Sequence, residues 1–126
     1  MKVVYASMTG NVNRFAKKLE FETVKIPRRG DLEVSEPFVL ITYTTGHGQI
    51  PKEVIAFLNN PTNAKNIVAV VGSGNRNWGE EWFCYSAKTI SQVFDVPLLH
   101  VFENSGFQSD AEIVTEKIKQ IKEGAN

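Results

Sequence analysis

Short runs of apolar residues recur along the chain and predict buried strands. Three of them, at residues 3–6, 38–43 and 67–71, are rich in β-branched side chains. Continuous runs of this kind are typical of parallel strands that are covered by helices on both faces of a sheet. Residues 98–102 form a fourth run. Residues 23–26 alternate more cleanly, which predicts an edge strand.

Between these runs, apolar residues recur at helical spacing. The stretches 12–19 and 83–94 each carry one apolar stripe with three- and four-residue spacing. A third helix is predicted to begin at Pro51 and to end before Asn60-Pro61. The last helix begins with the capping-box sequence Ser109-Asp110-Ala111-Glu112 and ends at Gly124.

The order of these elements predicts an α/β fold, with a doubly wound parallel sheet and helices on both faces, in a single domain over residues 1–126. A chain of this length can bury one core. Residues 27–36 lie where a further helix would complete the pattern, but they carry no helical stripe. We therefore expect an extended crossover there, which is long enough to pass one neighbouring strand.

In an open α/β sheet, ligands bind beyond the carboxyl ends of the strands, so the loops after the strands are informative. The first loop, Ser7-Met8-Thr9-Gly10-Asn11-Val12, offers two hydroxyls and a run of N–H groups at a helix start, which suits a phosphate. The alternative is that Ser7 or Thr9 caps the helix and Gly10 relieves a tight turn. The loop matches neither the P-loop nor the dinucleotide fingerprint.

Two glycine-rich loops follow later strands. Thr44-Thr45-Gly46-His47-Gly48 comes after residues 38–43, and Gly72-Ser73-Gly74-Asn75-Arg76-Asn77-Trp78-Gly79 comes after residues 67–71. Because glycine leaves the backbone accessible, such loops can approach the edge of a flat heterocycle. Trp78 either stacks on that ring or packs onto its own domain.

Taken together, the three loops resemble those of the NrdI family, the flavodoxin-like accessory proteins of class Ib ribonucleotide reductase. The motifs are hydroxyl-x-Thr-Gly-Asn, Tyr-Thr-Thr-Gly-x-Gly and Gly-Ser-Gly-Asn-x-x-Trp-Gly, each after its strand. The resemblance implies a five-stranded flavodoxin-like sheet in the order 2-1-3-4-5 and FMN as cofactor. It implies that residues 7–12 bind the FMN phosphate and that residues 44–48 and 73–79 border the isoalloxazine. The implied cofactor-binding residues are Ser7, Met8, Thr9, Gly10, Asn11, Val12, Thr44, Thr45, Gly46, His47, Gly48, Ser73, Gly74, Asn75, Asn77, Trp78 and Gly79.

The resemblance also implies a redox role. FMN hydroquinone would react with dioxygen, and the oxidant formed would pass to the dimanganese site of the reductase small subunit and drive formation of its tyrosyl radical. An upstream electron donor is implied as well. We expect an accessory protein, with no catalytic residues of its own, in place of a substrate-converting enzyme. The alternatives are a general one-electron flavodoxin and a small FMN-dependent reductase, for which the short loops offer no lid.

Composition and charge limit the other possibilities. The 14 basic and 14 acidic residues balance, so no overall field attracts nucleic acid or a membrane surface. No apolar run approaches the roughly 20 residues of a membrane span. The single cysteine and the absence of a signal-like start predict a cytoplasmic protein, and the scattered His and Cys residues predict no metal site. Cys84 itself reads as a buried, inert thiol.

Charge near the implied ring leads to one further expectation. Residues 43–51 and 72–79 contain no carboxylate, while Arg76 and His47 offer positive charge. Negative charge opposes formation of an anionic reduced flavin, so its absence predicts an easier second reduction step than in an acidic flavodoxin. His100 lies within a predicted strand and is expected to be a hydrogen-bonded structural residue.

Overall fold

The computed structural model describes residues 1–124, apart from the side chains of residues 78 and 123. Its centre is a parallel sheet of five strands in the order β2-β1-β3-β4-β5. This order confirms the predicted fold class. The strands are β1 (Lys2–Tyr5), β2 (Thr23–Lys25), β3 (Phe38–Tyr43), β4 (Ile67–Gly74) and β5 (Leu98–Glu103). The segment expected to be an edge strand is β2, at one margin of the sheet.

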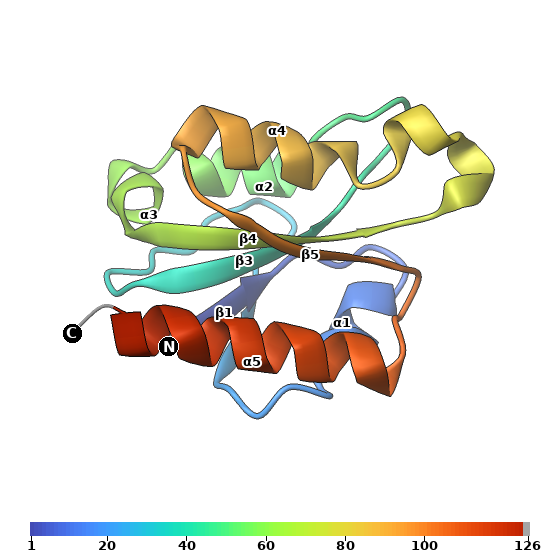
Figure 1. Cartoon of the computed structure of the whole chain (residues 1–126). Coiled ribbons are helices and arrows are strands. Elements are labelled where there is room, and N and C mark those ends of the chain that lie inside the picture. Colours follow the sequence, from blue (N-terminus) through green and yellow to red (C-terminus); the bar gives the residue numbers. More distant parts are fainter. Residues whose placement is uncertain (125–126) are drawn as a thin grey trace.

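Helices cover both faces of the sheet (Figure 1). On one face lie α1 (Asn11–Ala16) and α5 (Gln108–Gly124). On the other lie α2 (Lys52–Leu58), α3 (Pro61–Asn66) and α4 (Tyr85–Phe94). Successive residues of each central strand face opposite cores: Val3 packs with α1 and α5, and its neighbour Val4 packs with α2 and α4. This two-sided burial explains why the strands read as continuous apolar runs.

The predicted crossover is confirmed, because residues 27–37 contain neither helix nor strand. Asn63 of α3 fixes this segment. Its Oδ1 accepts the N–H of Val34 at 2.7 Å, and its Nδ2 donates to the carbonyls of Leu32 and Phe57 at 2.7 and 2.8 Å. Gly30, at φ 73°, lies so close to α2 that a Cβ there would stand 2.6 Å from the carbonyl oxygen of Glu53. The crossover is therefore bound to the helical layer that it passes.

Several helix starts differ from the predictions, and α2 begins at Lys52 with Pro51 as its N-cap. Helix α4 begins at Tyr85, not at Phe83, because Cys84 takes a left-handed conformation with φ 55° immediately before it. Helix α5 begins at Gln108, one residue before the predicted Ser109, and the cap is formed by Asp110, whose Oδ2 accepts the N–H of Phe107 at 2.7 Å. A carboxylate that reaches back to the N-cap N–H in this way is one half of a capping box.

Other elements were not predicted. Asn60-Pro61 ends α2 as expected, but it also starts α3: the Asn60 side chain accepts the N–H of Thr62 at 2.9 Å, and proline is favoured in a first helical turn. Two short 3₁₀ helices, η1 (Arg76–Trp78) and η2 (Glu80–Trp82), follow β4. The predicted helix over 12–19 is shorter, since α1 ends at Ala16, although Leu19 is still buried.

Candidate functional site

A cavity of about 400 Å³ opens at the carboxyl ends of β1, β3 and β4. Its walls come from the three loops that the sequence singled out, together with the loop after β5. The lining residues are Ser7, Met8, Thr9, Asn11, Val12, Tyr43, Thr44, Thr45, Gly46, Ser73, Gly74, Asn75, Trp82 and Asn104. Binding sites for small molecules span roughly 300 to 1,000 Å³, so this cavity is large enough for one such ligand.

The first wall is the turn between β1 and α1. Gly10 is the N-cap of α1, with φ 90°, and no side chain caps the helix at that position. The Ser7 hydroxyl accepts the N–H of Asn13 at 3.3 Å, so the helix-capping alternative holds for Ser7 in part. As this bond uses Ser7 Oγ only as an acceptor, its hydroxyl hydrogen stays available to a ligand. Thr9 is exposed at the cavity wall.

The second wall is the turn after β3. Thr45 and Gln49 exchange backbone hydrogen bonds of 3.0 and 2.8 Å and close this turn. Gly48, at φ 85°, lies against aromatic side chains: a Cβ there would stand 2.8 Å from Trp82 and 2.9 Å from Tyr85. The turn therefore packs closely against the segment that leads into α4. Gly46 of this turn lines the cavity.

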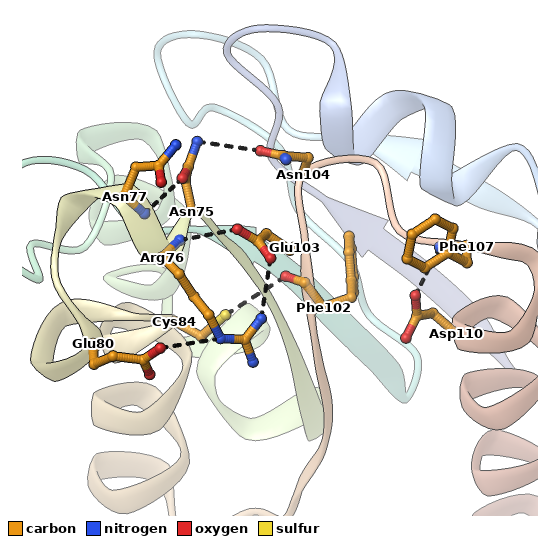
Figure 2. Close-up of polar contacts among 10 residues, drawn as sticks. All are labelled: Asn75, Arg76, Asn77, Glu80, Cys84, Phe102, Glu103, Asn104, Phe107 and Asp110. Atoms are coloured by element: carbon orange, nitrogen blue, oxygen red, sulfur yellow. Dashed lines mark hydrogen bonds and ion pairs between the residues drawn. The ribbon is translucent and has the colours of Figure 1, made fainter.

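The third wall joins the ends of β4 and β5 (Figure 2). Ser73 Oγ donates to the carbonyl of Asn104 at 2.8 Å, and the N–H of Asn104 donates to the carbonyl of Gly74 at 2.9 Å. The Asn75 and Asn104 side chains meet at 3.4 Å, and Asn75 Oδ1 also accepts the N–H of Asn77 at 2.8 Å. These bonds hold Asn104 at the cavity.

Arg76, the positive charge that the sequence offered near the ring, is paired with carboxylates, and the expected ease of the second reduction step stays a prediction. Its guanidinium lies 3.1 Å from Glu103 and 3.5 Å from Glu80 (Figure 2). It also stacks 3.9 Å above the ring of Phe83. Two carboxylates thus balance the one positive charge. Both carboxylates lie outside residues 72–79, because Glu103 belongs to β5 and Glu80 to η2. The sequence of the loop alone therefore does not reveal them.

A further carboxylate acts on the cavity through Tyr43. The Tyr43 hydroxyl donates to Glu53 of α2 at 2.9 Å. Burial, and then the hydrogen bond and negative charge of Glu53, raise the pKa of Tyr43 well above its ordinary value. Tyr43 therefore remains a neutral phenol whose hydroxyl is already committed as a donor.

Most of the predicted site residues lie together in the cavity wall, and the others lie in the same loops. Gly10, His47, Gly48, Asn77 and Gly79 are outside the lining. The side chain of Trp78 lies outside the described part of the structure, so both alternatives for it, stacking on the ring and packing onto the domain, stay open. Contact with FMN stays a prediction for every one of these residues.

The sequence reasoning missed three lining residues: Tyr43, Trp82 and Asn104. Tyr43 was read as the last residue of a strand, although its side chain reaches the carboxyl-end rim. Asn104 directly follows the edge strand β5, and the loop there contains no glycine-rich motif of the kind that marked the other three loops. Its one signal was the position of an asparagine directly after a strand, where left-handed turns occur, and its φ is indeed 56°.

Cys84 and His100 contribute to the structure and lie outside the cavity lining. Cys84 is buried, and its desolvation raises the pKa of the thiol to about 12, consistent with an inert group. His100 Nε2 and Asp110 Oδ1 lie 2.7 Å apart, which confirms a hydrogen-bonded role for His100. Among the side chains that the structure describes, no cluster of His, Cys, Asp and Glu is placed to hold a metal ion. None of the described helices has the length and apolar character to cross a membrane.

Comparison with known proteins gives a consistent result. The sequence profile of the family described as "NrdI Flavodoxin like" matches residues 3–116. The protein named "Protein NrdI" from Bacillus licheniformis is 41% identical over 121 residues, which is 96% of this chain and 89% of that protein. "Protein NrdI" from Mycobacterium tuberculosis is 39% identical over 122 residues, covering 89% of this chain and 81% of that protein.

Solved structures support the same fold. A short-chain flavodoxin associated with a non-canonical PDU bacterial microcompartment superposes with a TM-score of 0.73, at 20% identity, over 99% of this chain and 97% of its own. The two-electron-reduced flavodoxin of Megasphaera elsdenii superposes with a TM-score of 0.61, at 18% identity, over 91% of this chain and 98% of its own.

Proposed function

Since this chain belongs to the NrdI family of flavodoxin-like proteins, we propose that it is a redox accessory protein that supplies the oxidant for assembly of a ribonucleotide reductase cofactor. The family and the fold imply FMN as its cofactor, and the family is associated with ribonucleotide reductase. The finer part of the proposal is that the partner is the dimanganese small subunit of the class Ib enzyme, in the cytoplasm.

The single observation that carries this proposal is the cavity at the switch point of the sheet. Strand order reverses beside β1 and β3, and the cavity lies at their carboxyl ends, where doubly wound folds bind flavins. The residues present suit FMN. The hydroxyls of Ser7 and Thr9 suit a phosphate, as do the N–H groups at the start of α1 other than that of Asn13, which Ser7 Oγ accepts. Gly46 and Gly74 line the cavity with backbone atoms, which a flat ring can approach.

In this proposal, residues 7–12 hold the phosphate and the loops 44–48 and 73–79 border the isoalloxazine. When bound, FMN would supply the electron-transfer chemistry between an upstream two-electron donor and dioxygen. The chain would position the ring through the bonds of Thr44 to α4 and of Asn75 to Asn104, and it holds Tyr43 as a neutral phenol at the cavity wall. The reduced oxygen species would be the oxidant supplied to the manganese site of the partner.

The direct test is activation of the partner. The reduced holoprotein is mixed with a class Ib small subunit loaded with Mn²⁺, oxygen is admitted, and the tyrosyl radical is counted by electron paramagnetic resonance. We expect radical only when reduced holoprotein, manganese and oxygen are all present. Absence of radical with a small subunit that a known NrdI protein does activate would contradict the proposal.

The second candidate function is that of a general one-electron flavodoxin. The carboxylates around Arg76 are the observation that supports this candidate. Because Glu80 and Glu103 balance this arginine, the charge argument for an easy second electron is weaker than the sequence suggested. The two candidates differ in an anaerobic reductive titration. A long-lived one-electron-reduced flavin would favour the shuttle, and direct passage to the two-electron-reduced form would favour the accessory role.

A further inference from the structure

Arg14 of α1 lies beside the turn between β1 and α1. One terminal nitrogen of its guanidinium, Nη1, is 3.0 Å from the point where a Cβ of Gly10 would stand. The other, Nη2, donates to Oδ1 of Asn11 at 2.6 Å. Asn11 itself lines the cavity. The guanidinium therefore adjoins two consecutive residues of the turn.

A second anchor for Arg14 comes from the loop after β5, far along the chain. Arg14 Nε donates to Ser105 Oγ at 3.0 Å, and the same hydroxyl donates to Asn11 Oδ1 at 2.9 Å. Lys18 holds this loop in place, because its Nζ donates to the carbonyls of Ser105 and Gly106 at 3.2 and 2.9 Å. Arg14, Asn11 and Ser105 thus form a closed triangle that fixes the Asn11 side chain.

The charge of Arg14 has no carboxylate partner in the part of the chain that the structure describes. The ion pairs there involve Lys2, Arg76 and His100 with their acidic neighbours. Arginine stays charged at every relevant pH, and its planar fork matches the oxygens of a phosphate. The turn itself contains no lysine or arginine, so Arg14 brings a fixed positive charge to it from the following turn of helix.

Resting on the proposed FMN binding, we propose that Arg14, positioned by Asn11 and Ser105, makes this site selective for a flavin that carries a phosphate. Two effects act together. The guanidinium attracts the phosphate charge, and its bond to Asn11 holds one wall of the cavity in shape. Riboflavin lacks the phosphate and gains nothing from the first effect, so the ratio of FMN to riboflavin affinity reports on Arg14.

The test is a titration of the flavin-free full chain with FMN and with riboflavin, followed by quenching of flavin fluorescence. We expect Arg14→Gln to weaken FMN binding about tenfold or more, because the positive charge beside the phosphate and the bond that positions Asn11 are lost, and to change riboflavin binding less than about twofold. Raised salt should weaken FMN binding to the wild type more than to this variant. The matched control is Arg28→Gln, the same charge change on the exposed crossover, and it should alter neither affinity.

Two more variants separate charge from position. Arg14→Lys keeps the charge but cannot bond both Asn11 and Ser105, so we expect an intermediate affinity for FMN. Ser105→Ala should weaken FMN binding in the wild type and add little in the Arg14→Gln background, because the two residues act through one triangle.

Three results would overturn the inference. Equal FMN affinity of Arg14→Gln and wild type would show that the guanidinium does not act on the phosphate. An equal loss of FMN and riboflavin affinity would show a structural role only. If the wild-type chain bound neither flavin, the proposed function would fail, and the inference would fail with it for that separate reason.

Discussion

The hydroxyl of Thr44 accepts the backbone N–H of Ser86 at 3.1 Å, and this bond fastens the cavity loop after β3 to the first turn of α4. Helix α4 has no capping side chain at its own N-cap, where Cys84 stands in a left-handed conformation. A residue from a distant loop thus satisfies one of the N–H groups that every helix start leaves open. One bond serves both the stability of α4 and the placing of a cavity wall.

We therefore expect Thr44→Val to lower the free energy of unfolding by about 1 kcal/mol, because a largely buried N–H loses its acceptor. Thr44→Ser keeps the hydroxyl and is the matched control, with a much smaller loss. Urea unfolding followed by circular dichroism measures both. Equal stability of the Val and Ser variants would show that the bond contributes nothing.

Replacement of Glu103 tests the balance of charge around Arg76. Glu103→Gln leaves Arg76 with Glu80 only, so the site of the flavin becomes more positive and the two-electron reduction should become easier. The midpoint potential should rise by on the order of tens of millivolts at low salt and by less at high salt. Spectroelectrochemical titration of the holoprotein measures this shift.

The control for that experiment is Glu80→Gln. Glu80 is 78% exposed and its contact with Arg76 is longer, at 3.5 Å, so its replacement should shift the potential less. A fall in potential for Glu103→Gln would contradict the assigned sign of the effect.

Asp110 should make stability depend on pH. Burial alone would raise the pKa of this carboxyl, but the hydrogen bonds from His100 and from the N–H of Phe107 outweigh burial, and the pKa falls below its ordinary value. Because the folded pKa is depressed, the stabilisation is present in full above the unfolded pKa of about 3.9 and is lost as pH falls through the folded pKa.

Asp110→Asn should thus cost about 1 kcal/mol near pH 7, with the gap to wild type shrinking below about pH 4. Unfolding by urea at both pH values measures the gap. Glu112→Gln, an exposed acid in the same helical turn, is the control and should show no such gap. A gap that stayed constant between the two pH values would exclude the carboxylate as its cause.

Gly72, which the sequence predicted to begin a loop, lies within β4 and packs closely against α4. A Cβ at Gly72 would stand 2.8 Å from Cβ of Ala87 and 3.1 Å from Cβ of Cys84, so β4 and α4 approach closely there. We expect Gly72→Ala to destabilise the fold by about 1 to 3 kcal/mol through overpacking. Adding Ala87→Gly removes the nearest atom, so the double variant should be more stable than the sum of the single changes predicts. Thermal unfolding of the four proteins gives this coupling, and strict additivity would contradict the close contact.

Much of the fold was predictable from the sequence because it depends on local pattern. The buried strands could be recognised as continuous apolar runs, and the strand order followed from the family resemblance. The positions that failed depend on tertiary contact. Helix α4 starts late because Cys84, which lies against Gly72 and Gly74 of β4, takes a left-handed conformation. Helix α3 was not predicted because Asn60-Pro61 is equally typical of a helix end and of a helix start.

The candidate site divides in the same way. The glycines and hydroxyls that follow each strand marked the loops, but the partners of those loops come from elsewhere in the chain. Glu103 and Ser105 lie 27 and 91 residues from the arginines they contact, so no local motif could have paired them. The carboxylate partners of Arg76 could not be predicted from the loop sequence for this reason.

The central claim is that the cavity binds FMN and that the bound flavin is reduced by two electrons without a long-lived one-electron form. We would reconstitute the full chain with FMN, follow its absorbance during anaerobic dithionite titration, and compare the intermediate spectra with those of a one-electron flavodoxin. The account predicts stoichiometric FMN binding and little long-lived one-electron-reduced flavin between the oxidised and fully reduced forms. A chain that bound no FMN, or that accumulated the one-electron form as its main product, would contradict it.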